Sequence, residues 1–171
     1  MDVSGGKTDN GTKVHLWWII GHGAQIWQWD RTGQYLINPR SGKGLAIEGK
    51  SRNNGAAVHI WKIYNSWNHK YVYNREAMRL ECLDVNKAID LEGQNKGQGT
   101  KIHMWSTHGG TSQKWHLVRR VFITNPATGK MMDVAGCSKS NNTKVHLWAS
   151  NQSAAQIWGW FQTGSNGEGY L

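Results

Sequence analysis

The sequence has few cysteines, the residues that crosslink small domains and often bind metal ions. Its two cysteines, Cys82 and Cys137, are too few for a disulfide framework. They form no Cys-x-x-Cys pair and stand beside no spaced histidines, so we expect no zinc site. No apolar stretch is long enough to span a membrane, and the first residues do not have the pattern of a signal peptide. Amphipathic helical periodicity is absent too, which argues against a helical domain.

Acidic residues are also scarce, with 11 among 171 residues against 20 Lys and Arg, which gives a formal net charge of +9. Enzymes that hydrolyse sugars usually need two facing carboxylates, and no Ser-His-Asp order, phosphate loop or metal motif stands out. We therefore expect no enzymatic activity, no cofactor and no metal. The positive charge permits attraction to acidic glycans, nucleic acid or anionic membranes. The lysines are scattered without a basic run, so nucleic acid is not an expected partner, and a membrane would be reached only through surface glycans.

Glycine and tryptophan, by contrast, are abundant, with 21 and 11 residues, and their positions follow an internal repeat. A 17-residue pattern that ends in His-x-Trp occurs four times, and its starts are 44, 44 and 43 residues apart. We call these segments copies one to four: Met1–Trp17, Leu45–Trp61, Ile89–Trp105 and Met132–Trp148. The constant spacing leaves no room for a linker between them.

Each copy has the pattern of short strands separated by Gly and Asn turns, which predicts an all-β domain. In the strand Val14–Trp17, Val14 and Leu16 point to one side and His15 and Trp17 to the other. The aliphatic pairs of the four copies are the better core candidates. In copies one, three and four the preceding strand places an Asp between two apolar residues. If the two strands are neighbours, Asp, His and Trp share one outer surface.

This combination of side chains suits a sugar. A Trp ring can cover the apolar C–H face of a pyranose, while a carboxylate accepts hydrogen bonds from adjacent hydroxyls and an imidazole supplies another bond. One such shallow site would bind at about millimolar strength, or about −4 kcal/mol, and several on one rigid body would gain affinity through multivalency. The alternative is that the Trp rings lie under loops and the Asp residues only cap turns.

A second motif, Gln-x-Trp, follows the Trp of three copies at a fixed distance, and His69-Lys70-Tyr71 is a degraded version in copy two. At these residues the chain resembles the ricin-type lectins, a β-trefoil family marked by repeated Gln-x-Trp motifs. The resemblance implies a β-trefoil built from repeats of about 44 residues. It also implies binding of galactose or N-acetylgalactosamine, and sometimes of xylose-type polymers. The intact motifs are Gln25-Ile26-Trp27, Gln113-Lys114-Trp115 and Gln156-Ile157-Trp158.

The resemblance also implies which residues bind the sugar. The matching positions are Asp2, His15, Trp17 and Gln25; Asp90, His103, Trp105 and Gln113; and Asp133, His146, Trp148 and Gln156. The family often has Asn just before the motif Gln, and only copy two keeps it. Copy two has lost the Asp, however, so we expect its site to be degenerate. Its residues are Ala46, His59, Trp61 and Asn68.

Four copies exceed the three that one trefoil needs. We expect residues 1–32 to be an incomplete repeat without its opening strand, residues 33–160 to form a complete three-repeat trefoil, and residues 161–171 to be a C-terminal tail. Copies one and four agree at 11 of 17 positions, which favours tandem trefoils in a longer array. Alternatively, the incomplete repeat pairs with another chain, or Tyr170 and Leu171 supply its missing strand.

The sequence thus predicts a multivalent carbohydrate-binding module of the galactose or N-acetylgalactosamine type, whose partners are glycoproteins, glycolipids or polysaccharides. The alternatives are a structural or protein-interaction trefoil and a binder of sulfated or xylan-type polysaccharides. Binding through lysines would weaken with salt, whereas stacking on Trp would be competed by a neutral monosaccharide. The pattern does not specify the sugar or the compartment, and favours an extracellular or cell-surface location only slightly.

Overall fold

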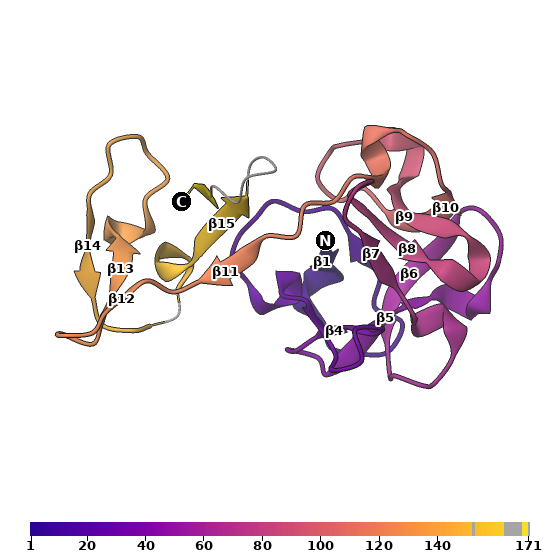
Figure 1. Ribbon diagram of the computed structural model, residues 1–171, viewed down its shortest axis with the longest axis horizontal. Helices are drawn as coiled ribbons and strands as arrows, with labels where there is room; N and C mark the ends of the chain where they lie inside the picture. Colours follow the sequence, from indigo (N-terminus) through magenta and orange to yellow (C-terminus); the bar gives the residue numbers. More distant parts are fainter. Residues whose placement is uncertain (152, 163–168, 171) are drawn as a thin grey trace. The chain divides into compact units, whose positions relative to one another are not determined.

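The computed structural model describes residues 1–151, 153–162 and 169–170, which form short β-strands joined by single 3-10 turns (Figure 1). The chain divides into two compact units, residues 1–116 and residues 117–171, and each is described by itself. The described residues contain no helix that is long and apolar enough to cross a membrane. The all-β class and the β-trefoil expected from the repeat are confirmed.

The strands of unit 1 are β1 (Asp2–Val3), β2 (Val14–His15), β3 (Gln28–Trp29), β4 (Leu36–Asn38), β5 (Lys43–Ile47), β6 (Ala56–Trp61), β7 (Val72–Asn74), β8 (Arg79–Cys82), β9 (Lys87–Leu91) and β10 (Ile102–Ser106). Those of unit 2 are β11 (Arg119–Val121), β12 (Thr124–Asn125), β13 (Lys130–Val134), β14 (Val145–Trp148), β15 (Trp158–Gln162) and β16 (Gly169–Tyr170). The 3-10 turns are η1 (Ser4–Gly6), η2 (Gly23–Gln25), η3 (Glu48–Lys50), η4 (Trp67–His69), η5 (Leu83–Val85), η6 (Glu92–Gln94), η7 (Thr111–Gln113), η8 (Ala135–Cys137) and η9 (Ala154–Gln156).

In each copy a first strand is followed by a 3-10 turn and a loop, and then by a second strand that pairs with the first in antiparallel orientation. The pairs are β1 with β2, β5 with β6, β9 with β10 and β13 with β14. The turn after the first strand contains a glycine in the left-handed region in every copy, with φ between 61° and 64°, where a side chain would be strained. The two strands of each copy are thus neighbours in all four copies, which was the condition for a shared Asp, His and Trp surface.

A ring of backbone hydrogen bonds joins the first three copies. The Gly11 N–H donates to the Ile60 carbonyl at 2.9 Å, Gly55 to Met104 at 2.9 Å and Gly99 to Leu16 at 2.8 Å. The three donors are 44 residues apart, as are the three acceptors, and the third bond returns to copy one. This closed cycle is the pseudo-threefold arrangement of a trefoil. Gly11, Gly55 and Gly99 all have φ between 83° and 86°, which favours glycine.

The core of unit 1 lies inside this ring. The predicted aliphatic pairs supply much of it, since Val58 and Ile60 are completely buried and Val14 is nearly so. Ile102 and Met104 complete the set in copy three, and Leu16 packs against it. The prediction that these residues form the core is confirmed for the first three copies.

Copy four differs, because Val145 is 51% exposed and Leu147 is 44% exposed. The prediction that this pair lies in a core is wrong for the described structure. Copy four is in unit 2, where no second copy is present to form a ring across that face. Its strand pair has the same register as the other three, so the difference lies in the missing partners and not in local folding.

The ring groups copies one to three, whereas the trefoil predicted from the sequence comprised copies two to four within residues 33–160. The boundary between the two compact units lies directly after His116. Within unit 2, β15 pairs with β16 through Phe161 and Tyr170, and Leu171 lies outside the described residues. The strand that would open copy one is not among those of unit 1, and the ways in which it could be completed stay predictions.

The contrast between the copies gives a stability prediction. Replacing Ile60 with Ala leaves a cavity at the centre of the ring, and we expect it to lower the free energy of unfolding by about 2–5 kcal/mol. The matched change Leu147→Ala, on the exposed face of copy four, should cost less than about 1 kcal/mol. Urea unfolding of both variants measures this difference. Equal costs would show that the Leu147 face is covered in solution.

Candidate functional site

The predicted Asp and His residues stand directly opposite each other on neighbouring strands. The register pairs Asp2 with His15 and Asp133 with His146. In copy one the His15 Nε2 donates to the Asp2 Oδ2 at 3.1 Å, and in copy four His146 Nε2 lies 3.2 Å from an Asp133 oxygen. In both copies the Asp and the His, which were expected only to share one surface, are therefore in direct contact.

The alternation of the strand predicted that the carboxylates face outward, but all three are buried. Asp2, Asp90 and Asp133 are only 3–6% exposed. They lie on the predicted side of the strand, but the imidazoles and the segment around the Gln-x-Trp motif cover them. Because the carboxylates are shielded from water, hydrogen bonds to them are stronger than in open water.

The Trp rings are the exposed parts of these sites. Trp17 is 37% exposed, Trp105 is 39% and Trp148 is 55%. Each stacks on the His two residues before it, with ring centroids 5.0–5.4 Å apart and planes within 23° of parallel, and the same stack occurs at His59 and Trp61. The stack fixes the plane of each indole relative to the imidazole and leaves part of the ring exposed.

Copy three departs from the predicted arrangement at its imidazole. His103 stands opposite Asp90 and is buried, but the carboxylate receives its hydrogen bond from His108, whose Nε2 lies 2.9 Å from Oδ2. The His108 Nδ1 accepts from the Gly110 N–H at 3.0 Å, so the proton resides on Nε2 and is donated to Asp90. His108 is not among the residues predicted from the sequence. The stretch His108-Gly109-Gly110 could have indicated this role, because its tight turn lets the imidazole accept a hydrogen bond from the backbone of its own loop.

The charge states of this site follow from its contacts. Burial alone would raise the pKa of Asp90, but contacts with Ser112, His108 and Gln113 outweigh it and hold that pKa below its usual value. Burial lowers the pKa of His103, although the carboxylates of Asp90 and Glu92 oppose the shift. At neutral pH the copy-three site therefore presents an ionised carboxylate and a neutral stacked imidazole.

The Gln of the Gln-x-Trp motif connects the site to the loop that follows its Trp. In copy three the Gln113 Nε2 donates to the Ser106 carbonyl at 3.0 Å and to Asp90 at 3.0 Å, and its Oε1 accepts from the His108 N–H at 2.9 Å. Gln25 and Gln156 bridge the carbonyl seven residues earlier and the N–H five residues earlier in the same way. Gln113 and Gln156 are completely buried. These amides therefore position the loop that follows the Trp, and the amide of Gln113 also contacts the Asp.

The aromatic residue of the motif points into the core, as expected. Trp27, Trp115 and Trp158 each donate their indole N–H to the carbonyl of the residue 26 positions earlier, at 3.0–3.3 Å. Trp27 and Trp115 pack against the core of unit 1, and the equivalent Tyr71 is buried within it. These rings are structural, which leaves the His-x-Trp rings as the surface aromatics of the sites.

Copy two has the stacked rings but no carboxylate. Ala46 stands opposite His59 and is completely buried. A hollow of about 500 Å³ lies here, lined by His59 and Trp61 of the copy together with Asn68 and His69. Three of the four degenerate-site residues, His59, Trp61 and Asn68, thus line one hollow, and Ala46 does not.

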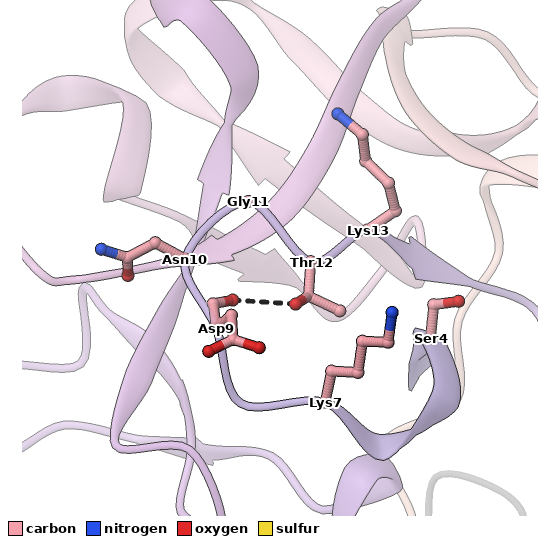
Figure 2. A pocket seen from close by; sticks show the side chains of 7 residues that line it. All are labelled: Ser4, Lys7, Asp9, Asn10, Gly11, Thr12 and Lys13. Carbon is pink, nitrogen blue, oxygen red and sulfur yellow. Dashed lines mark hydrogen bonds between the residues drawn. The ribbon is translucent and has the colours of Figure 1, made fainter.

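A second hollow, of about 340 Å³, lies in the loop that leads to β2, and Figure 2 shows the seven residues that line it. Its walls come from the turn in which the Thr12 hydroxyl donates to the Asp9 carbonyl at 2.8 Å. No residue of the predicted sugar sites lines it. It is a feature of the loop that carries the ring-forming Gly11.

Among the described residues no group of three or more His, Cys, Asp or Glu is placed to hold a metal ion. Cys82 is buried and Cys137 is exposed, and both are free thiols. Burial raises the pKa of the Cys82 thiol to about 11, so it is protonated at neutral pH.

The loop connection through Gln113 can be tested by removing it. We expect Gln113→Ala to lower the free energy of unfolding by about 1–3 kcal/mol, because the His108 N–H and the Asp90 carboxylate lose buried partners. Amide exchange of residues 106–110 should quicken by more than that of β9. The control Gln28→Ala, at an exposed strand position, should change stability by less than about 0.5 kcal/mol. Unchanged exchange in that loop would show that other contacts hold it.

Comparison with solved structures supports this architecture. A designed threefold-symmetric protein, ThreeFoil, is 27% identical over 70% of this chain and 89% of its own, with a TM-score of 0.65. An exo-β-1,3-galactanase from Clostridium thermocellum is 26% identical over 66% of this chain and 26% of that enzyme, with a TM-score of 0.59. The C-half of an earthworm R-type lectin, solved with GalNAc, is 19% identical over 66% of this chain and 84% of its own, with a TM-score of 0.55. At 19% identity, the match to the earthworm lectin supports the fold alone.

No sequence among the curated proteins matches the chain closely enough to count as a relative. The family model for the ricin-type beta-trefoil lectin domain-like family, however, matches residues 1–61, 23–105, 61–148 and 111–170, which together cover nearly the whole chain. These overlapping matches follow the same repeat that builds the ring and the four strand pairs. The chain therefore belongs to the ricin-type beta-trefoil lectin domain-like family, and it is a carbohydrate-binding domain.

Proposed function

We propose that this chain is a multivalent lectin for neutral sugars of the galactose or N-acetylgalactosamine type, with one shallow site in each of copies one, three and four. Each site combines a buried carboxylate, an imidazole and an exposed indole. The sites are Asp2, His15 and Trp17; Asp90, His103, His108 and Trp105; and Asp133, His146 and Trp148.

The observation that carries the proposal is the exposed, stacked Trp beside a buried and hydrogen-bonded Asp. An indole that is 37–55% exposed loses water when a sugar ring covers it. The carboxylate below can accept hydrogen bonds from two adjacent hydroxyls of the same sugar. A buried Asp that only stabilised its own loop would not require an exposed aromatic ring at the same place in three copies.

The ring also shapes the sites of unit 1, because each indole adjoins the loop of a neighbouring copy. Gly99 lies beside the Trp17 ring. The Asn54 Oδ1, from the loop of copy two, accepts from the Ser106 N–H directly after Trp105 at 3.0 Å. Copy four has no such neighbour in unit 2 and its Trp148 is the most exposed of the three. We therefore expect the sites of copies one and three to bind more tightly than that of copy four.

The galactose preference is supported by the likeness to a galactanase at 26% identity, and it is a proposal for this chain. We also propose that the chain itself has no catalytic activity, since its recurrent acid is a single Asp in three of the four copies. Glycoproteins, glycolipids or polysaccharides are the proposed partners. Tandem trefoils or an oligomer would multiply the sites and raise the avidity.

The sites can be counted by removing one carboxylate at a time. Titration with galactose, N-acetylgalactosamine and xylose, followed by Trp fluorescence, should show saturable binding at about millimolar concentration. Asp2→Asn and Asp90→Asn should each weaken binding at their own site by about tenfold or more, because the neutral amide is a weaker acceptor. Raising the salt concentration should leave the affinity unchanged.

Trp18→Ala is the matched control, since Trp18 is exposed but belongs to no proposed site. It should alter the fluorescence baseline and leave the binding constant as it was. A folded protein that responds to none of the three sugars, or whose binding collapses in salt, would contradict the proposal and favour a structural role or a lysine-based sulfate site.

A further inference from the structure

Copy two contains an unusual group of unsatisfied side chains. His59 Nδ1, Asn68 Oδ1 and His69 Nδ1 are buried and have no hydrogen-bond partner among the described residues. The three residues are 6%, 5% and 2% exposed, and all three line the hollow of about 500 Å³. Buried polar groups in folded proteins are normally paired. Asp90 Oδ1 and Ser112 Oγ in copy three are unpaired in the described part of the chain as well, but in copy two the three unpaired atoms belong to residues that line one hollow, which makes it a candidate ligand site.

The other copies show what a ligand can supply here. In copies one and four the imidazole that stands opposite the Asp bonds its carboxylate through Nε2, at 3.1 and 3.2 Å. In copy two the register places Ala46 opposite His59, so the Asp that would bond the His59 Nε2 is replaced by Ala. His59 lines the hollow, although Ala46 does not, and a ligand in the hollow can supply the carboxylate.

The charges around the hollow fit an anion. Lys50 of η3 lines it, and its charge acts on His69. The nearest acid, Glu48, is held by an ion pair with Lys13. Burial lowers the pKa of both imidazoles, that of His69 to about 4, with help from Lys13 near His59 and from Lys50 near His69. Both rings are therefore neutral at pH 7, and the site has an unopposed lysine.

We propose that copy two is not a dead site but binds a sugar that carries its own carboxylate, such as a uronic acid. The carboxylate accepts from an imidazole N–H and from the Lys50 ammonium, in the role that Asp has in the other copies. A ring hydroxyl donates to the Asn68 Oδ1, whose amide nitrogen already donates to the Ile47 carbonyl at 3.1 Å. The Trp61 ring, stacked on His59, covers the face of the sugar.

The site should respond to pH. A carboxylate beside His59 raises the pKa of that imidazole, so binding is accompanied by proton uptake and tightens as the pH falls. The other charged groups that face His59 and His69 are Lys13, Glu48 and Lys50. Glu48 and the uronic acid both stay ionised at pH 5.5, so the change reports the imidazoles. We expect about threefold to tenfold tighter binding at pH 5.5 than at pH 7.5.

The test is a titration with D-galacturonic acid, followed through the imidazole proton signals of His59 and His69 in NMR spectra. The decisive variant is Ala46→Asp, which supplies the internal carboxylate and should weaken galacturonic acid binding by at least tenfold. The equivalent Asp residues of three copies are buried at this position, so the fold tolerates the change. Ala127→Asp, at an exposed turn, adds the same charge elsewhere and should have no effect.

Two further variants test the proposal if the Ala46→Asp variant does not fold. His69→Gln installs the residue of the other copies and should reduce the pH dependence of galacturonic acid binding. Lys50→Asn keeps a residue that tolerates the left-handed backbone, where Lys50 has φ of 52°, and should weaken binding severalfold. Galacturonic acid that does not shift the His59 and His69 signals, or that binds equally well to Ala46→Asp, would overturn the proposal. Galactose binding in the same samples reports the other sites separately, so a failure here is distinct from a failure of the proposed function.

Discussion

The structure depends on the ring of backbone hydrogen bonds that joins Gly11 to Ile60, Gly55 to Met104 and Gly99 to Leu16. No single copy can bury its aliphatic pair, because one strand pair has only one face to offer. Closing three copies into a cycle brings those faces together. Copy four shows the consequence of having no cycle: its strands pair in the usual register, but Val145 and Leu147 remain exposed. Local sequence therefore makes the hairpin, and association of copies makes the core.

The same ring connects stability with binding. The face of each strand pair that points away from the core carries His and Trp, and the loop of the neighbouring copy adjoins that surface. The Lys62 N–H donates to Asn10 at 2.9 Å just after Trp61, as Ser106 does to Asn54 after Trp105. A change that loosens the ring would therefore disturb the sites as well. Stability measurements belong beside any binding measurement, because weaker binding could otherwise be assigned to the wrong residue.

The repeat spacing predicted the fold class, and the strand alternation predicted that Asp and His lie on the same side of their strands, because both features depend on local period and sterics. The register that sets each Asp opposite its His was not predicted. The repeat spacing could not predict which three copies close the ring. Copies one and four agree at 11 of 17 positions, so each carries the same aliphatic face, and the choice depends on tertiary packing. The partner of Asp90 was also beyond the pattern. His103 stands opposite that carboxylate, but the turn at Gly110 brings His108 to it, a contact that depends on loop geometry. The buried position of the motif Gln follows from the same loop.

The copies also show how one scaffold can carry different chemistry at equivalent places. Asp2 and Asp133 meet the imidazole of the adjacent strand, Asp90 meets an imidazole from the following loop, and Ala46 leaves the imidazole without a carboxylate. The ring tolerates all these versions because the Asp position points away from the core that holds the copies together. Loss of the carboxylate therefore need not mean loss of function. With Lys50 nearby and the buried polar atoms unpaired, it changes the charge of the ligand that the site can accept.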